Sequence, residues 1–324
     1  MGRSWKLEST IIYKLPGPDK SFSDGLKDFL QDLRVLCHPP LQDHPNIIQL
    51  LGVAWFAGCS FGSVQPEAEL LQWPIVLIER APFGSLKHFL DRLSHTSRPS
   101  LQTKFRLYLD VLHALWVRSP GIAILEHELN SHRQDLHTCG IVHGDVKCEN
   151  VLMFKSGDGD AMEEWRAKIT DFGSSIIRLD DTDSNGRLKL ELYGTELYQP
   201  PELDNGSRRL HPDEAKSVDV WCWGMLLWSV MIDGQNYVDA KDDSELKAKI
   251  RDLRNNDRVA EVAVESVRKV LDDEHGGDDF EIISLVCDLI EKTLSKNASG
   301  RIDIDQIYRK THDRLPHLHG RWSP

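Results

Sequence analysis

The sequence lacks the marks of a secreted, membrane-spanning or nucleic-acid-binding protein. Its six cysteines are scattered without any C-x-x-C pair, so neither a zinc ribbon nor a disulfide framework is indicated. The longest apolar run, residues 220–232, is well short of the ~20 residues that a membrane-spanning helix requires. Positive charge is also scarce, since 39 Lys and Arg against 51 Asp and Glu give a net charge of −12. This balance disfavours non-specific binding to nucleic acid.

The N-terminal residues, MGRSWKLEST, contain no apolar segment of the kind that a secretory signal needs. Lys6 also breaks the N-myristoylation pattern, which requires Ser or Thr at this position. We therefore expect a cytoplasmic or nuclear protein with reduced thiols, and neither nucleic acid nor a membrane among its partners. With 324 residues, the chain is long enough to bury one large core or two lobes.

Strand-like segments come early in the chain and helical segments come later. β-Branched and apolar residues predict strands at 7–16, 47–56 and 73–79, with a helix at 25–36. Apolar residues at helical spacing then predict helices at 85–93, 102–115, 217–231, 244–253, 280–294 and 302–310. This order favours an α+β fold with two unequal lobes and a cleft between them.

The segment HGDVKCENVLM, residues 143–153, gathers polar side chains that suit phosphoryl transfer. This reaction needs an acid near the acceptor hydroxyl, a cation near the transferring phosphate and oxygen ligands for Mg²⁺. Asp145, Lys147 and Asn150 offer these three groups within one short loop. Asp171 in the segment TDFG offers a second metal-binding group, and Gly173 is expected to let the backbone turn sharply after it.

Together with motifs elsewhere, these segments resemble the eukaryotic protein kinase superfamily, and the resemblance covers most of the chain. HGDVKCEN is similar to the catalytic loop, and DFG matches the magnesium-binding motif. GTELYQPPE, residues 194–202, resembles the end of the activation segment, and SVDVWCWG, residues 217–224, resembles the start of the buried central helix. HPNIIQLLG, residues 44–52, and VLIERAPFGSL, residues 76–86, resemble the fourth strand and the hinge. All of these motifs occur in the family's order.

The resemblance implies a bilobal fold, with a truncated, small, β-rich N-lobe and a larger, mainly helical C-lobe. Residues 1–84 would form a partial N-lobe and hinge, and residues 85–324 the C-lobe. No G-x-G-x-x-G precedes Lys14, so the glycine-rich loop and the first two strands are expected to be absent. Residues 117–133 interrupt what the family has as one nearly continuous helix. A retained intron and a genuine surface loop are equal alternatives for this atypical insert.

The resemblance also implies a role for each candidate site residue, with ATP and Mg²⁺ as cofactors and a protein with a Ser or Thr acceptor as partner. Asp145 would accept the proton of the acceptor hydroxyl, and Lys147 would stabilise the transferring phosphate. Asn150 and Asp171 would bind Mg²⁺. The residues implied to hold the nucleotide are Lys14 with its partner Asp32, then Ile78, Glu79 and Ala81 at the hinge, and Leu152.

A further set of residues is implied to support the site structurally. These are His143, Phe172, Gly173, Thr195, Glu202, Asp219 and Arg301. Within this set, Asp219 would brace the catalytic loop, and Arg301 would form an ion pair with Glu202. His143 and Phe172 would join Leu36 and Leu50 in a stacked apolar spine.

Gly144 departs from family members that carry an arginine before the catalytic aspartate. Where present, this arginine receives an activation-loop phosphate, in a charge-assisted contact worth about 1.5–3 kcal/mol. We therefore expect activity that does not depend on phosphorylation of the activation segment. The positions of Lys147 and Thr195 resemble the pattern of serine/threonine kinases rather than that of tyrosine kinases.

Two other interpretations stay open. A pseudokinase, serving as a scaffold with impaired ATP binding, is favoured by the missing glycine-rich loop. It is disfavoured by the retained Asp145, Lys147, Asn150 and Asp171. A small-molecule phosphotransferase of the aminoglycoside or choline kinase type shares the HGD loop. That class typically lacks the lysine of this loop, the GTELYQPPE segment and the DVWCWG helix, so it is the weaker alternative.

Overall fold

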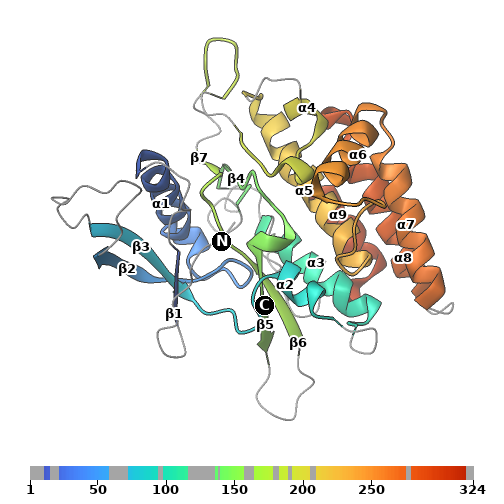
Figure 1. The fold of residues 1–324 in the computed structure, drawn as a ribbon, viewed down its shortest axis with the longest axis horizontal. Helices are drawn as coiled ribbons and strands as arrows, with labels where there is room; N and C mark the ends of the chain where they lie inside the picture. The colour runs from blue at the N-terminus through green and yellow to red at the C-terminus, as the bar shows by residue number, and fades with distance from the viewer. Residues whose placement is uncertain are drawn as a thin grey trace, which may run out of the picture.

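The computed structural model describes residues 11–14, 22–57, 72–93, 98–115, 136–137, 139–156, 164–177, 182–188, 192–204, 209–274 and 279–318. The described elements form a small strand-rich part and a larger helical part, which lie on opposite sides of Figure 1. This is the α+β arrangement that the sequence predicts. The insert at 117–133 lies outside the described residues, so neither explanation of it is tested.

The strand-rich part is a three-stranded antiparallel sheet covered by one helix. Its strands are β1 (Ile11–Lys14), β2 (Leu50–Ala57) and β3 (Gln72–Glu79), in the order β1-β3-β2. Helix α1 (Phe22–Leu36) packs against β3, and its Leu26 lies against buried Ile75. Phe29, Leu33, Val35 and Leu36 of α1 pack in or against the main core, which fixes the helix on the sheet.

Two short antiparallel strand pairs lie between the sheet and the helices. Strand β4 (Ile141–Val142) pairs with β7 (Ile176–Ile177), and β5 (Val151–Ser156) pairs with β6 (Glu164–Ile169). Residues 143–150 connect β4 to β5, and residues 170–175 connect β6 to β7. Because both ends of these two connections are tied together by paired strands, the two loops that carry the HGD and DFG motifs lie side by side.

Strand β2 begins later than the sequence predicts, at residue 50 rather than 47. The Ile48 N–H donates to the carbonyl of Ile169 (3.0 Å), and the Ile169 N–H donates to the carbonyl of Asn46 (2.8 Å). Residues 46–48 therefore extend the β5–β6 hairpin instead of the N-terminal sheet. This pairing joins the two parts of the molecule directly beside Asp171.

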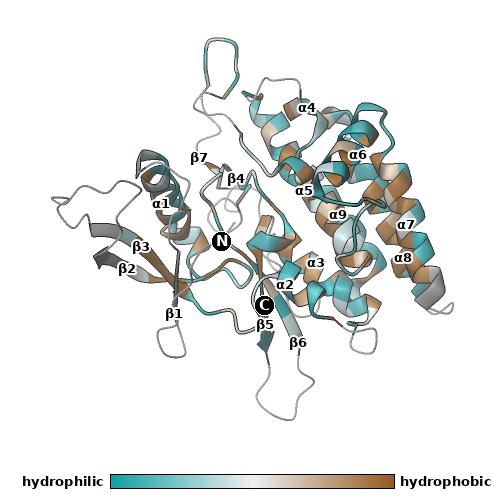
Figure 2. Ribbon diagram, viewed as in Figure 1, coloured by the Kyte–Doolittle hydropathy of each residue, from teal (hydrophilic) through white to brown (hydrophobic). Residues whose placement is uncertain are grey.

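The helical part packs around α5 (Pro212–Met231), in which every residue from Val218 to Met231 is buried. Around it lie α2 (Leu86–Asp91), α3 (Leu101–Leu115), the short α4 (Pro201–Asp204), α6 (Asp243–Asn255), α7 (Val259–Glu274), α8 (Phe280–Thr293) and α9 (Ile304–Arg314). Trp223 of α5 stacks on Tyr108 of α3, with ring centroids 3.7 Å apart. Hydrophobic and hydrophilic segments alternate along the surrounding helices, as Figure 2 shows. No helix in the described part of the chain is long and apolar enough to cross a membrane.

Helix α7 was not predicted from the sequence. Val259, Ala263, Val267 and Leu271 recur every four residues along it, and all four are buried. This spacing is a helical signal. The valines favour strands when taken one by one, but contacts of α7 with α5, α6 and α8 override that preference.

Candidate active site

Two polar side chains of the loop 143–150 converge on the carboxylate of a third, Asp145. Lys147 Nζ lies 2.7 Å from Asp145 Oδ2, and Asn150 Nδ2 donates to the same oxygen (3.2 Å) and to the Asp145 carbonyl (2.9 Å). A short 3₁₀ helix, Cys148–Asn150, folds the chain back so that residues two and five positions after Asp145 reach it. The side chains of Asp145 and Lys147 remain 13% and 18% exposed, so a solvent-borne group can reach both.

Thr195 completes this cluster from a distant part of the sequence. Its backbone N–H donates to Asp145 Oδ1 (2.8 Å), and its hydroxyl accepts a hydrogen bond from Lys147 Nζ (2.6 Å). Both oxygens of Asp145 and the ammonium group of Lys147 therefore have defined positions. The same two hydrogen bonds attach the start of the segment 195–202 to the loop 143–150.

Buried Asp219 of α5 holds the backbone at the start of the loop. Its Oδ2 accepts from the His143 N–H and its Oδ1 from the Gly144 N–H, each at 2.8 Å. His137 Nε2 lies 2.8 Å from Asp219 Oδ2. These contacts satisfy a carboxylate that burial would otherwise penalise. The role of His137 was not predicted from the sequence, because the two side chains that meet are 82 positions apart.

Gly144 occupies a position where no larger side chain fits. Its φ is +77°, a left-handed conformation that disfavours residues with a Cβ. A Cβ atom built there would lie 2.9 Å from both Leu192 Cδ2 and the Ser174 carbonyl oxygen. The space that an arginine would need next to Asp145 is therefore filled by the apolar Leu192, which is fully buried.

The DFG loop is held from the strand-rich part by α1. Asp32, which is almost fully buried, accepts a hydrogen bond from the Phe172 N–H at 2.7 Å. The Phe172 ring is buried against the His143 ring, with centroids 5.1 Å apart. The left-handed residue of this loop is Asp171 (φ +66°), and Gly173 has no positive φ.

The expected role of Gly173 is therefore corrected. A Cβ at Gly173 would lie 3.2 Å from the Cβ and Cγ atoms of Asp28 on α1. The glycine allows the helix to approach the loop closely, and Asp171 itself makes the turn. A non-glycine residue with positive φ costs energy, and such residues cluster at functional sites.

The residues predicted to form the hinge lie near the two loops. Ile78 and Glu79 end strand β3, and the Glu79 carboxylate accepts from the Gln49 N–H (2.8 Å) and from Lys168 Nζ (2.6 Å). Ala81 is buried, with its carbonyl 3.3 Å from the Gly84 nitrogen. Leu152, partly buried on β5, pairs with Ser85 in an isolated bridge that brings the predicted hinge next to β5.

Lys14 is described only through its backbone, which pairs with Val76 in the sheet. Its side chain lies outside the described part of the structure, so the predicted pair of Lys14 with Asp32 stays a prediction. Leu36 and Phe172 are both buried in the core, and Leu50 packs against it. The members of the predicted spine thus border one common apolar core.

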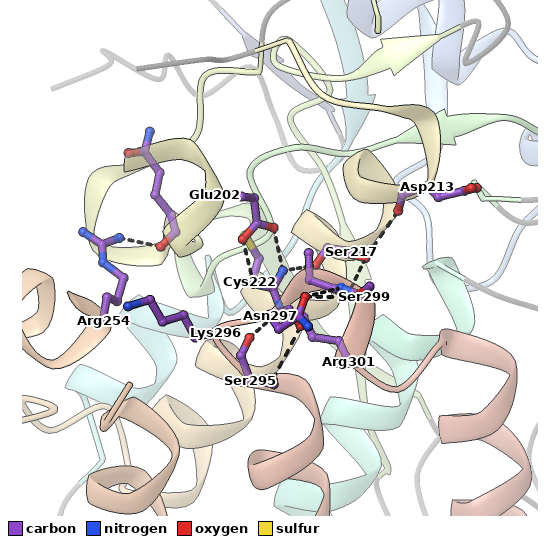
Figure 3. Close-up of polar contacts among 12 residues, drawn as sticks. Glu202, Asp213, Ser217, Cys222, Arg254, Ser295, Lys296, Asn297, Ser299 and Arg301 are labelled. Atoms are coloured by element: carbon purple, nitrogen blue, oxygen red, sulfur yellow. Dashed lines mark hydrogen bonds and ion pairs between the residues drawn. The ribbon is translucent and has the colours of Figure 1, made fainter. Parts of the chain in front are cut away.

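The segment 194–202 ends at a bidentate ion pair, drawn in Figure 3. Arg301 Nη1 and Nη2 lie 2.6 and 2.7 Å from the two carboxylate oxygens of Glu202. Arg301 also donates to the carbonyls of Ser295 (2.9 Å) and Ser217 (3.0 Å), and its side chain is 1% exposed. This pair anchors the segment to the helical core.

Arg254 of α6 is a second buried arginine against the same segment, and its burial was not predicted from the sequence. Its Nη1 donates to the carbonyls of Glu196 (3.1 Å) and Gln199. An arginine in an amphipathic helix is normally expected to face solvent. Its position in line with buried Leu246 and Ile250, at a spacing of four residues, is the signal that could have revealed it.

The donor set fits magnesium bound together with a nucleotide better than a dedicated metal site. No group of three or more His, Cys, Asp or Glu side chains suited to a metal occurs among the described residues. Asn150 and Asp171 offer amide and carboxylate oxygens, and Mg²⁺ is commonly held by one or two such ligands together with substrate phosphates. Cys148 contributes no charge nearby, because burial raises the pKa of its thiol to about 11.

Comparison with known proteins identifies the family. The family described as protein kinase domain matches residues 132–312, more than half of the chain. Testis-specific serine/threonine-protein kinase 1 of Mus musculus is 32% identical over 127 residues, which cover 39% of this chain and 30% of the mouse protein. Protein nipi-4 of Caenorhabditis elegans is 24% identical over 211 residues, or 64% of this chain and 45% of that protein.

A third similar protein is a growth factor receptor homolog. Fibroblast growth factor receptor homolog 2 of Drosophila melanogaster is 27% identical over 240 residues, covering 72% of this chain and 19% of the receptor. The matched region is thus less than half the length of each of these relatives. The match over 132–312 contains the HGD and DFG loops, the segment 194–202, and helices α5 and α6. The chain belongs to the protein kinase domain family.

Proposed function

We propose that this chain transfers the γ-phosphoryl group of ATP to Ser or Thr hydroxyls of protein substrates. The observation that carries the proposal is the cluster of Asp145, Lys147 and Thr195, in which both the carboxylate and the ammonium group are positioned by hydrogen bonds. Asp145 orients the acceptor hydroxyl and takes its proton. Lys147 lies next to that carboxylate and neutralises charge on the transferring phosphoryl oxygens.

Other residues hold the nucleotide in this proposal. Lys14, positioned by Asp32, binds the α- and β-phosphates, the backbone of Glu79 and Ala81 meets adenine, and Ile78 and Leu152 line the pocket. Magnesium bound by Asn150 and Asp171 would neutralise charge on the triphosphate. Residues up to 84 form the N-lobe and hinge, and residues from 85 onward form the C-lobe.

Specificity for Ser and Thr is supported by the hydroxyl contact between Thr195 and Lys147. The names of the relatives do not decide this point, because they include serine/threonine kinases and a growth factor receptor. Phosphoamino-acid analysis is therefore the informative readout.

The test incubates the full chain with Mg²⁺ and γ-labelled ATP, using casein, myelin basic protein and a Glu-Tyr copolymer as acceptors. We expect phosphoserine and phosphothreonine on the first two, and an Asp145→Asn variant that loses about 10²–10⁴-fold in rate. Activity equal in both proteins would refute the role of Asp145, and labelling of tyrosine alone would refute the specificity. Absence of both transfer and thermal stabilisation by millimolar Mg-ATP would favour the pseudokinase interpretation.

A further inference from the structure

A buried guanidinium group, that of Arg254, binds the segment 194–199 from helix α6. Arg254 is 1% exposed and belongs to the largest fully buried side chains of the described structure. Its Nη1 donates to the carbonyls of Glu196 (3.1 Å) and Gln199, which begin and end one turn of the segment. Figure 3 shows the side chain reaching from α6 toward that turn.

A neighbouring arginine provides a contrast on the same helix. Arg251 forms an ion pair with the Glu196 carboxylate, but its side chain is 54% exposed. Exposed pairs of this kind contribute little, because solvent screens them and both side chains lose freedom. Arg254 instead donates from a buried position to backbone atoms, where a charge-assisted bond is stronger and costly to remove.

The turn held by Arg254 is connected directly to the reacting groups. Glu196 follows Thr195, whose N–H binds Asp145 and whose hydroxyl binds Lys147. Gln199 closes the turn, because its side-chain amide donates to the Gly194 carbonyl at 2.9 Å. A shift of the turn at its α6 side would therefore move Thr195 relative to Asp145.

We propose that Arg254 is a positioning residue for the protein acceptor: it fixes the segment 194–199 so that an acceptor chain lying on it presents its hydroxyl to Asp145. This inference rests on the proposed function and deepens it. Arg254 touches neither nucleotide nor reacting atoms and acts through the two carbonyls. Its effect should consequently appear in transfer to protein, and not in reactions of ATP that need no acceptor chain.

The test compares Arg254→Met, Arg254→Lys and the control Arg258→Ala in the full chain. Arg258 is an exposed arginine that follows the same helix, and its guanidinium group forms an ion pair with Glu261. Three quantities are measured for each protein: kcat/KM for casein, KM for ATP, and slow hydrolysis of ATP with water as acceptor.

For Arg254→Met we expect kcat/KM for casein to fall by about tenfold or more, with KM for ATP and ATP hydrolysis within about twofold of wild type. Arg254→Lys keeps one donor group and should recover part of the loss, and Arg258→Ala should change nothing. Equal losses in casein phosphorylation and ATP hydrolysis would overturn the proposal in favour of a general structural role. Unchanged casein phosphorylation would overturn it as well.

Hydrogen exchange separates failure of this inference from failure of the proposed function. Arg254→Met should lose protection at the amides of residues 195–199 while α8 keeps its protection. If the wild-type chain transfers no phosphate, the proposed function and the acceptor role both fall, and exchange still reports whether Arg254 orders the segment. Unchanged exchange would contradict the structural basis itself.

Discussion

At the scale of single residues, the hydroxyl of Thr195 links the segment 194–202 to Lys147, the residue proposed to stabilise the transferring phosphate. Thr195→Val removes the acceptor for Lys147 and leaves the backbone bond to Asp145 in place. Hydrogen bonds to charged groups contribute about 1.5–3 kcal/mol, so phosphoryl transfer should fall by roughly 10- to 100-fold. Steady-state kinetics of Thr195→Val and Thr195→Ser would measure this.

Thr195→Ser is the matched control, because serine retains the hydroxyl and loses only a methyl group. It should keep most of the wild-type rate. Equal rates in the valine and serine variants would show that the hydroxyl contact has no catalytic consequence.

His44 is a buried histidine whose charge state couples stability to pH. Burial lowers the pKa of His44 to about 4, and its Nδ1 accepts a hydrogen bond from the Asn46 N–H at 3.1 Å. The folded protein therefore holds it neutral, while the unfolded chain binds a proton near pH 6.5. The stabilisation is complete above pH 6.5 and is lost as the pH falls toward 4, by about 3 kcal/mol in total.

His44→Asn should remove this dependence, because an Asn side chain can accept the same local hydrogen bond without titrating. Urea unfolding at pH 7.5 and 5.5 is the measurement. The wild type should lose about 1 kcal/mol more than the variant between these two values. Parallel losses in both proteins would mean that His44 titrates normally in the folded state.

At the scale of elements, the contact of the catalytic loop with Leu192 decides what position 144 can hold. Gly144→Ala places a Cβ 2.9 Å from Leu192 and Ser174 in a left-handed conformation. Gly140→Ala is the matched control, with φ +71° and nothing within 4 Å of the added atom. The left-handed conformation should destabilise both variants by roughly 1–2 kcal/mol. Only Gly144→Ala should lose further stability, because its Cβ collides with Leu192 and Ser174.

Thermal unfolding of the two variants would measure that difference. Equal melting temperatures would contradict the close packing of Leu192 on the loop. Because the position is filled, an arginine introduced at 144 should destabilise the loop rather than create a phosphate site. This supports the expectation of activity that does not depend on phosphorylation of the segment.

Helices and strands were predictable from the sequence where the spacing of their apolar residues indicates one kind of secondary structure. Helix α1, the strands β2 and β3 and most later helices follow apolar periodicity. Helix α7 and the start of β2 were not predicted correctly. In both cases packing or pairing with distant segments outweighs the local preference of β-branched residues.

At the scale of the whole molecule, the pair of Glu202 and Arg301 joins parts of the chain 99 positions apart. Arg301→Met leaves the Glu202 carboxylate, only 15% exposed, without its partner. Breaking a buried pair from one side typically costs 3–5 kcal/mol, so unfolding by urea should shift by about that amount.

A double-mutant cycle tests whether the pair itself is responsible. Glu202→Gln combined with Arg301→Met should recover part of the lost stability, because no uncompensated charge remains. Additive losses would assign the effect to the other contacts of Arg301, namely its bonds to the carbonyls of Ser217 and Ser295 and its position over the Trp221 ring.

The sequence alone was sufficient for the class of fold and for the spacing of Asp145, Lys147 and Asn150, because these groups meet within one short loop. Only the tertiary structure brought Thr195 to Lys147, His137 to Asp219, Asp32 to Phe172 and Arg254 to the segment 194–199. It also moved the turn of the DFG loop from Gly173 to Asp171. The physical reason is the sequence distance between the partners. Local spacing and periodicity determine contacts within one loop or helix. The contacts of Thr195, His137, Asp32 and Arg254 arise instead from the packing of elements far apart in the chain.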